Sequence, residues 1–503
     1  MPTRVLDLKR HASESRVCLL EVPPGLKAPY ATLSYCWGDA QNLRLSRNLL
    51  LPISTSGVPL GELPLTIKEA CELCLGLGID YLWICSLCIF QDSESDWQEQ
   101  SSVMDTIYNS SALTISAASS RHCASGLFIK DISRAREVVE LKCQITDGPS
   151  GSCVLRASLE PGGHYEPTSR RGWTLQENLL STRLITFGTY ELSYQCRASQ
   201  WNETGRVRKP TAYSQSIFPC PSLELPLHEW PERRVVVNSK EELWRALVIE
   251  YSGRVLSLEK DELPAISGIA KWLVKSPPRW QDEAYVAGLW RSQLPSTLLW
   301  YNSLGLPLPP VGKGGVTRPE TYRAPSWSWA CLSGNSLHWL DTKTQEDTAM
   351  ILACNVISKS EDHFGQIQDA TMDVRASMKR GWLVPTISHP ESFEFWADNW
   401  RDKFENRGLY VREESLGVVF LDTHDAAASF TEEVDPKQPG VYSCDCLRLT
   451  TNAGLLIVRS QGRGLNETDA CFDVRKRIGV VDFWREKAES WWRDSLVTTV
   501  RLI

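Results

Sequence analysis

Strand-like and helix-like patterns of hydrophobic residues follow one another over the first 120 positions. Residues 31–36 (ATLSYC) and 112–118 (ALTISAA) are rich in apolar and β-branched side chains, which predicts a strand in each. Residues 81–84 (YLWI) are apolar throughout, which is typical of a strand covered on both faces. The stretches between these strands are long enough to hold helices, so the order is that of an α/β sheet.

Two helices are predicted between the strands. In residues 66–75 (TIKEACELCL) the apolar side chains share one face, and Thr66 with Glu69 has the spacing of a capping box. A second helix is predicted over residues 96–108, with Ser93 or Ser95 as its N-cap and with Trp97, Met104 and Tyr108 on its inner face. The alternation of strands and helices favours a mainly parallel sheet with right-handed crossover connections.

Composition and pattern divide the whole chain into four parts. They are an α/β domain at 1–200, a linker or lid rich in Pro and Ser at 201–235, a helical region rich in Trp at 236–335, and a mixed α+β, β-rich C-terminal region at 336–503. Within the first part, a helix is predicted at 170–181, followed by a hairpin that turns at Gly188 and Thr189.

Composition also narrows the class of protein. The chain has 503 residues and a net charge of -7, so it lacks the basic stripe that a nucleic-acid-binding protein needs. No apolar run approaches the roughly 20 residues of a membrane span, and the N-terminus has no signal-peptide pattern. The 16 cysteines do not have zinc-site spacing and are predicted to be free thiols in a reducing compartment. We therefore expect a cytoplasmic protein without a metal site.

Cys85 and Cys88 lie in the stretch YLWICSLCIFQDSESDW, where an apolar run gives way to polar residues. On a strand, side chains three positions apart point to opposite faces, so a redox pair is not favoured. Cys88 is interpreted as a core residue. Cys85 lies near the carboxyl end of the strand, where the dipole of the following helix would stabilise a thiolate. Cys85 is therefore a candidate nucleophile, and the alternative is a small buried apolar residue.

The acids after this strand form a second group of candidates, with Asp92 and Glu99 as catalytic carboxylates. Acidic residues favour helix N-termini because they complement the helix dipole, which explains the cluster without any site. The functional alternative places Asp92 in the crevice beyond the carboxyl ends of the strands, where open α/β sheets bind ligands.

Candidate ligand-binding residues follow the first strand and lie on the helix at 170–181. They are Tyr35, Trp37 and Gly38 after the strand and Arg171, Gln176 and Glu177 on the helix, with Glu177 also a candidate catalytic carboxylate. The turn at Gly38 either brings the backbone close to a ligand or packs against the protein. Arg171 either contacts the phosphate of a ligand, with Glu177 as a neighbouring carboxylate, or ties the helix to the sheet.

Several stretches, in order and spacing, resemble the fungal heterokaryon-incompatibility (HET) domain. They are YATLSYCWG at 30–38, LPLTIKEA at 63–70, YLWICSLCIFQDSESDW at 81–97 and RGWTLQE at 171–177. Later stretches, among them YVAGLW and YRAPSWSWA, resemble the region that commonly follows this domain in long fungal members, so that the resemblance extends to about residue 331. The resemblance implies an intracellular fungal protein that triggers growth arrest and cell death when genetically unlike hyphae fuse. It also implies a flavodoxin-like, mainly parallel sheet with helices on both faces, because the domain is regarded as a distant relative of the Toll/interleukin-1 receptor (TIR) fold. Some members of that fold hydrolyse NAD.

Two positions depart from the pattern of that family. Cys85 stands where the family usually has Asp, and Gln100 stands where an acid commonly occurs, with Glu99 one position earlier. If the chemistry of the domain needs the Asp, this chain has lost it or exchanged it for thiol chemistry.

Three functions remain open at this point. The leading one is recognition of a protein partner, of a second copy of the chain or of a small-molecule ligand, followed by a signal of the incompatibility class. The second is cleavage of the nicotinamide–ribose bond of NAD, with Asp92, Glu99 and Glu177 supporting an oxocarbenium-like state. The third is an enzyme of secondary metabolism that uses the Cys85 region. No cofactor is predicted, and NAD enters only as the substrate of the second function.

Overall fold

The computed structural model describes residues 1–11, 14–39, 42–128, 138–144, 150–156, 166–189, 191–196, 199–203, 207–208, 240–275, 283–302, 316–333, 337–342, 345–385, 393–396, 415–422, 442–459, 473–483 and 485–503. The chain forms two compact units, the first from residues 1–236 and 265–280 and the second from residues 237–264 and 281–503. The predicted linker or lid at 201–235 lies mostly outside the described residues.

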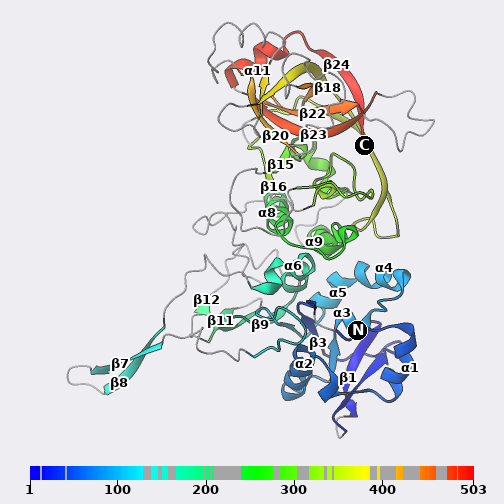
Figure 1. Cartoon of the computed structure of the whole chain (residues 1–503), viewed down its shortest axis with the longest axis vertical. Coiled ribbons are helices and arrows are strands. Elements are labelled where there is room, and N and C mark those ends of the chain that lie inside the picture. The colour runs from blue at the N-terminus through cyan, green and yellow to red at the C-terminus, as the bar shows by residue number, and fades with distance from the viewer. Residues whose placement is uncertain are drawn as a thin grey trace. The chain divides into compact units, whose positions relative to one another are not determined.

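A ten-stranded sheet forms the centre of the first unit (Figure 1). In spatial order its strands are β12 (Val207–Arg208), β11 (Gln200–Asn202), β10 (Leu192–Cys196), β9 (Arg183–Phe187), β6 (Leu113–Ser116), β3 (Tyr30–Ser34), β5 (Tyr81–Trp83), β1 (Arg4–His11), β2 (Arg16–Glu21) and β4 (Val58–Pro59). A separate hairpin pairs β7 (Val138–Gln144) with β8 (Ser150–Arg156). The three strands predicted in the first 120 residues are present as β3, β5 and β6, and the predicted hairpin is β9–β10.

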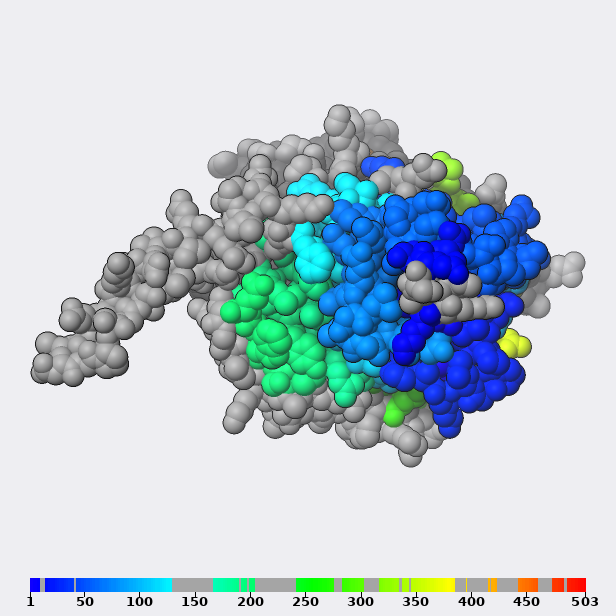
Figure 2. All heavy atoms as spheres, turned by 90° about the horizontal axis from the view of Figure 1, so that it is seen from below, coloured from blue at the N-terminus to red at the C-terminus, as the bar shows by residue number. Residues whose placement is uncertain are grey.

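The sheet is mixed, so the prediction of a mainly parallel sheet was wrong. Within the described part of this sheet, only β5, β3, β6 and β9 pair in parallel, in that order. The strands β1, β2 and β4 add antiparallel pairs on one side, and β10, β11 and β12 add them on the other. Figure 2, seen from below, shows the segment 166–203, which supplies β9–β11, lying beside the first 128 residues. Antiparallel additions of this kind depend on contacts between distant residues, which a local hydrophobic pattern does not encode.

Helices cover both faces of the parallel strands. The described helices of this part of the chain are α1 (Arg47–Thr55), α2 (Leu65–Gly76), α3 (Cys85–Cys88), α4 (Glu94–Ser102), α5 (Met104–Asn109), α6 (Gly172–Leu179) and α9 (Pro264–Lys275). Of these, α1 packs against the antiparallel strand β2, and α9 is joined to α6. The Tyr30 hydroxyl donates to the backbone oxygen of Ile107 in α5, and the Thr32 hydroxyl is linked through Thr114 to Ser181 after α6. The even-numbered residues of β3 therefore face α5 and α6. By alternation the odd-numbered residues face the other side, where α2 packs against β3 (Figure 1).

The helix predicted at 96–108 consists of two helices, α4 and α5, which meet at Val103. The predicted N-cap is confirmed, because the Ser93 side chain accepts a hydrogen bond from the Asp96 N–H at 3.4 Å. The break at Val103 turns the chain, so that α4 and α5 are separate elements of the helix layer rather than one long helix.

The capping box predicted at Thr66 and Glu69 was wrong. The N-cap of α2 is Pro64, which makes no side-chain hydrogen bond. The Thr66 hydroxyl instead accepts from the Gly126 N–H at 3.0 Å, and a Glu69 carboxylate oxygen accepts from the Leu127 N–H at 2.5 Å. The two side chains thus bind a loop after β6 to α2. Their spacing in the sequence is that of a capping box, but their partners lie on this loop.

A buried ion pair fastens the first strand to the helix layer. The Arg4 guanidinium donates to both oxygens of Asp96, at 2.5 and 2.6 Å, and to the backbone oxygen of Cys88 at 2.9 Å. It also lies over the ring of Phe90, 4.4 Å from the centroid. Asp96, one of the acids after β5, therefore has a structural role.

The second unit contains an eight-stranded sheet. Its strands are β17 (Met350–Ser358), β18 (Ile367–Pro385), β19 (Phe393–Trp396), β20 (Gly417–Leu421), β21 (Tyr442–Arg448), β22 (Ala453–Arg459), β23 (Asp473–Phe483) and β24 (Leu496–Leu502). Because β18 pairs with both β19 and β21, the strands β18, β19, β20, β23, β22 and β21 close into a ring. Side chains of the ring and of α11 (Arg485–Trp492) form one apolar cluster. The predicted β-rich C-terminal region is confirmed.

The tryptophan-rich part of this unit precedes the ring in sequence. It contains α8 (Lys240–Ser252), the hairpin of β13 (Tyr285–Val286) with β14 (Leu289–Trp290), and the pair of β15 (Trp300–Asn302) with β16 (Leu337–Trp339). The side chains of Trp327 and Trp329 are fully buried, as expected for core scaffold.

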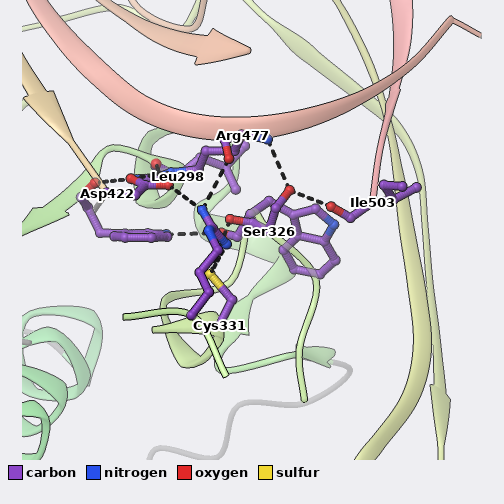
Figure 3. Close-up of polar contacts among 9 residues, drawn as sticks. Leu298, Ser326, Cys331, Asp422, Arg477 and Ile503 are labelled. Carbon is purple, nitrogen blue, oxygen red and sulfur yellow. Dashed lines mark hydrogen bonds and ion pairs between the residues drawn. The ribbon is translucent and has the colours of Figure 1, made fainter. Parts of the chain in front are cut away.

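A buried guanidinium joins the tryptophan-rich part to the ring (Figure 3). Arg477 of β23 is fully buried and donates to the Asp422 carboxylate at 3.0 to 3.2 Å. It also donates to the backbone oxygens of Leu298 and Trp300. Asp422 in addition accepts a hydrogen bond from Arg318 at 2.9 Å. One carboxylate thus faces two guanidinium groups.

No helix among the described residues is both long enough and apolar enough to span a membrane. The cysteines whose side chains are described are free thiols, as the sequence predicted.

Asp422→Asn is expected to lower the free energy of unfolding by about 3–5 kcal/mol, because it leaves two guanidinium groups without their carboxylate. Asp80→Asn is the matched control, since its carboxylate is partly exposed and pairs with the exposed Lys9, and it should have a far smaller effect. Chemical denaturation followed by tryptophan fluorescence measures both variants. Equal losses of stability would contradict the structural role of Asp422.

Candidate functional site

The strand order reverses at the carboxyl ends of the parallel strands. The chain runs from the central strand β3 to β5 on one side and then to β6 on the other. Open α/β sheets bind ligands outside the carboxyl ends of their strands at such a point. The side chains at the ends of β3, β5 and β6 are therefore the candidate site.

Cys85 follows the strand end, as predicted, but it begins a helix that also contains Cys88, so the two cysteines do not alternate as residues of one strand. The strand β5 ends at Trp83, and α3 is a single turn that starts at Cys85. Cys88 is fully buried, as predicted. Burial raises the pKa of the Cys85 thiol to about 12, the nearby Glu177 carboxylate adds to the rise, and a hydrogen bond from the Trp37 indole opposes it. The thiol is therefore protonated at neutral pH, contrary to the expected stabilisation of a thiolate by a helix dipole.

Glu177 is a buried carboxyl group at the end of α6. Its side chain is 5% exposed, and burial raises its pKa above the ordinary value of a glutamate. The Ser34 hydroxyl, the charge of Arg171 and the Tyr108 hydroxyl act in the opposite direction, because they stabilise the carboxylate. A carboxyl group whose pKa is raised by burial and lowered by neighbouring groups is suited to donate or accept a proton.

Arg171 is the neighbour that these groups have in common. Its guanidinium donates to the backbone oxygen of Tyr35 at 3.0 Å, which fixes the start of α6 to the end of β3. Burial raises the pKa of Cys36, and the Arg171 charge opposes that rise as it does for Cys85 and Glu177. The structure thus brings a guanidinium, a carboxyl group and two thiols together at the strand ends.

Tyr35 and Trp37, which follow β3, lie beside this cluster. The buried Tyr35 hydroxyl donates to the Ser86 hydroxyl at 2.8 Å and accepts from the Asn42 amide at 2.9 Å. The Trp37 ring is half-buried, and the Arg44 guanidinium lies 5.1 Å from its centroid. The two aromatic side chains differ in role, since Tyr35 is locked by hydrogen bonds and Trp37 borders solvent.

Gly38 packs against the loop that follows β6. Its φ is +66°, and a Cβ at this position would lie 2.3 Å from the Cβ of His122. Only glycine combines this backbone conformation with so close an approach. The packing interpretation of the turn is therefore favoured over contact with a ligand.

Asp92, Glu99 and Gln176 are not brought into the cluster. Asp92 is exposed and accepts a hydrogen bond from the Arg47 N–H at 3.1 Å, at the start of α1. Glu99 is exposed on α4. Gln176 is buried, and its side-chain oxygen accepts from the Gly268 N–H at 3.1 Å, which fixes α9 to α6.

Three members of the cluster were not predicted as site residues. They are Ser34, Cys36 and Tyr108, all buried. Ser34 and Cys36 lie in the stretch that was expected to form the first strand, and Tyr108 was expected on the inner face of a helix. Their meeting with Glu177 results from the strand order and from the packing of α5 and α6, for which the sequence carries no local signal.

Residues 30–177 match the family described as heterokaryon incompatibility protein (HET). The chain contains a HET domain. The match starts at the first residue of β3 and ends at Glu177, so it includes every residue of the strand-end cluster. The strands β1 and β2 belong to the same sheet as the HET domain but precede the match.

No curated protein and no solved structure matches the chain.

Alkylation of Cys85 by iodoacetamide is expected to be slow at pH 8 and to rise towards pH 12, because only the thiolate reacts. Glu177→Gln should raise the rate at a given pH, by about tenfold for each unit by which it lowers the pKa of Cys85. The matched variant Glu99→Gln should leave the rate unchanged. Mass spectrometry of the Cys85 peptide gives the rates, and a wild-type rate at pH 8 equal to that of an unperturbed cysteine would contradict the assignment.

Proposed function

We propose that this chain is a fungal protein of the heterokaryon-incompatibility class that triggers growth arrest and cell death after recognising a partner or ligand. The observation that carries the proposal is the HET match over residues 30–177, which coincides with the segment that builds the strand-end cluster. The stretches at 30–38, 63–70, 81–97 and 171–177, on which the resemblance to the HET domain was first noted, all fall within this segment.

The buried charges support a ligand-dependent form of this function. A buried carboxyl group destabilises the folded protein unless neighbouring groups compensate for lost hydration. Here the buried Glu177 side chain of α6 lies with Arg171 beside it, at the point of the sheet where ligands bind in other α/β proteins. A ligand that carries an anionic group would be attracted to the Arg171 guanidinium and would alter the environment of Glu177.

Induced expression of the chain in a filamentous fungus is expected to arrest growth. Glu177→Gln and Arg171→Ala should relieve the arrest, because each removes one charge of the cluster. Glu99→Gln and Arg170→Ala are matched controls at exposed positions and should still arrest growth. Colony diameter is the readout, with immunoblots to show equal protein levels, and normal growth with the wild-type chain would reject the proposal.

A second candidate function is cleavage of the nicotinamide–ribose bond of NAD. It is favoured by one observation, the raised pKa of Glu177 at the strand-order reversal. The parallel order β5–β3–β6–β9 supports it further, because flavodoxin-like sheets also place their first strand between the second and the third. The Glu177 carboxylate would support an oxocarbenium-like transition state. Thiol chemistry of a secondary-metabolite enzyme has less support, since Cys85 is held as a protonated thiol.

Purified chain incubated with NAD is expected, on this second candidate, to release nicotinamide. Glu177→Gln should lower the rate by a factor of about 100 or more, the size expected for a lost general acid, base or charge partner. Glu99→Gln should retain the wild-type rate. Chromatography of the products measures turnover, and absence of nicotinamide above the protein-free background rejects this candidate without affecting the first.

A further inference from the structure

A row of polar side chains crosses five neighbouring strands at the level of the strand-end cluster. Ser34 of β3 is the register partner of Ser116 in β6, and Ser116 is the partner of Thr186 in β9. Thr186 is in turn the partner of Ser193 in β10, and Ser193 of Asn202 in β11. Directly paired residues project from the same face of a sheet, so these five residues, called the polar row below, share one face.

The face that carries the polar row is the one that α5 and α6 cover. Ser34 follows Thr32 by two positions and Ser116 follows Thr114 by two positions, so each pair of side chains points the same way. Thr32 and Thr114 are hydrogen-bonded to each other at 2.7 Å, and Ser181 after α6 donates to Thr114 at 2.5 Å. Ser34 in addition faces the Glu177 carboxyl group.

The Ser116 hydroxyl lacks a hydrogen-bond partner among the described residues, whereas the Thr114 hydroxyl, two positions earlier on the same face of β6, has several. Thr114 contacts three hydroxyl groups, those of Thr32, Ser111 and Ser181. Ser116 is fully buried, and within the described part of the chain its oxygen has no hydrogen-bond partner. A buried hydroxyl without a partner is unfavourable, and native proteins fill such positions with water or with a ligand.

Exposure increases along the polar row. Ser34 and Ser116 are fully buried beside Glu177, whereas Thr186, Ser193 and Asn202 are half-buried. The row therefore connects the buried carboxyl group with positions that border solvent. A molecule that reached Glu177 would meet hydroxyl and amide groups along this face.

The chemistry of the polar row selects one class of molecule. Hydroxyl groups both donate and accept, and neighbouring strands space them about 4.8 Å apart. The row itself carries no charge and no large apolar side chain, so it is unsuited to an apolar ligand. A molecule with several hydroxyl groups matches it, because each of its hydroxyls can donate to one side chain and accept from the next.

We propose that the polar row binds the hydroxyl groups of a sugar, with Ser116 as a ligand-contacting residue next to Glu177. The proposal rests on the proposed ligand-dependent function and names the class of ligand. The sugar is either a free phosphorylated sugar or the sugar moiety of a nucleotide, since both present the same hydroxyl groups. Arg171, beside Glu177, would accommodate the negative group that both carry.

Binding of ribose, ribose 5-phosphate and NAD to the purified full chain tests this inference by calorimetric titration. At least one of the three is expected to bind, and Ser116→Ala should weaken that binding about tenfold, the usual effect of one lost hydrogen bond. Binding of ribose 5-phosphate identifies a free sugar phosphate as the source, and binding of NAD alone identifies the nucleotide. The melting temperature of Ser116→Ala should be unchanged or higher, because the substitution removes an unsatisfied buried hydroxyl.

Ser181→Ala is the contrasting variant. Its hydroxyl donates to Thr114 and to the backbone oxygen of Glu177, so its loss should lower the melting temperature and leave the affinity of the folded protein unchanged. The inference is overturned if the wild-type chain binds none of the three molecules, or if Ser116→Ala binds as tightly as the wild type. A chain that binds a sugar through Ser116 but does not arrest growth would keep this inference and reject the proposed function.

Discussion

The organisation of the HET domain depends on the burial of one carboxyl group at the carboxyl ends of its parallel strands. Glu177 lies on α6 and is buried, and burial alone would favour its neutral form. Ser34, Arg171 and Tyr108 offset that effect, and each comes from a different element of the fold. The Glu177 carboxyl group therefore has neighbours from β3, from α5 and from the start of α6.

Local pattern was sufficient for the elements that bury a continuous apolar stretch. The strands β3, β5 and β6, the hairpin β9–β10 and the β-rich C-terminal region all follow from it. The local pattern failed where the same short sequence is compatible with two different local structures or two different sets of partners. Cys85 and Cys88 follow an apolar run and were compared as if they alternated on a strand, but both lie in a single helical turn. Thr66 and Glu69 have capping-box spacing, yet they serve a loop about 60 residues further along the chain.

The candidate site was predictable only in part. Cys85, near a predicted strand end, and Arg171 and Glu177, on the predicted helix at 170–181, were candidates from the sequence, and the structure brings them together. Asp92 and Glu99 were chosen as acids near a strand end, but the position of an acid on a helix surface depends on the helix orientation, and both are exposed elsewhere. The polar row could not be found from sequence, because its members are adjacent only through strand register.

The strand β1 lies before the HET match and yet between β5 and β2 in the sheet. A fragment trimmed to residues 30–177 would lose it, and the hydrogen-bonding edge of β5 would be open to pairing with another molecule. The same cut would remove Arg4 and leave the Asp96 carboxylate without the guanidinium with which it forms an ion pair. It would also delete Gly268, the donor to Gln176. The cooperative folding unit is thus larger than the segment by which the domain is recognised, and dissection of its activity has to begin at the first strand.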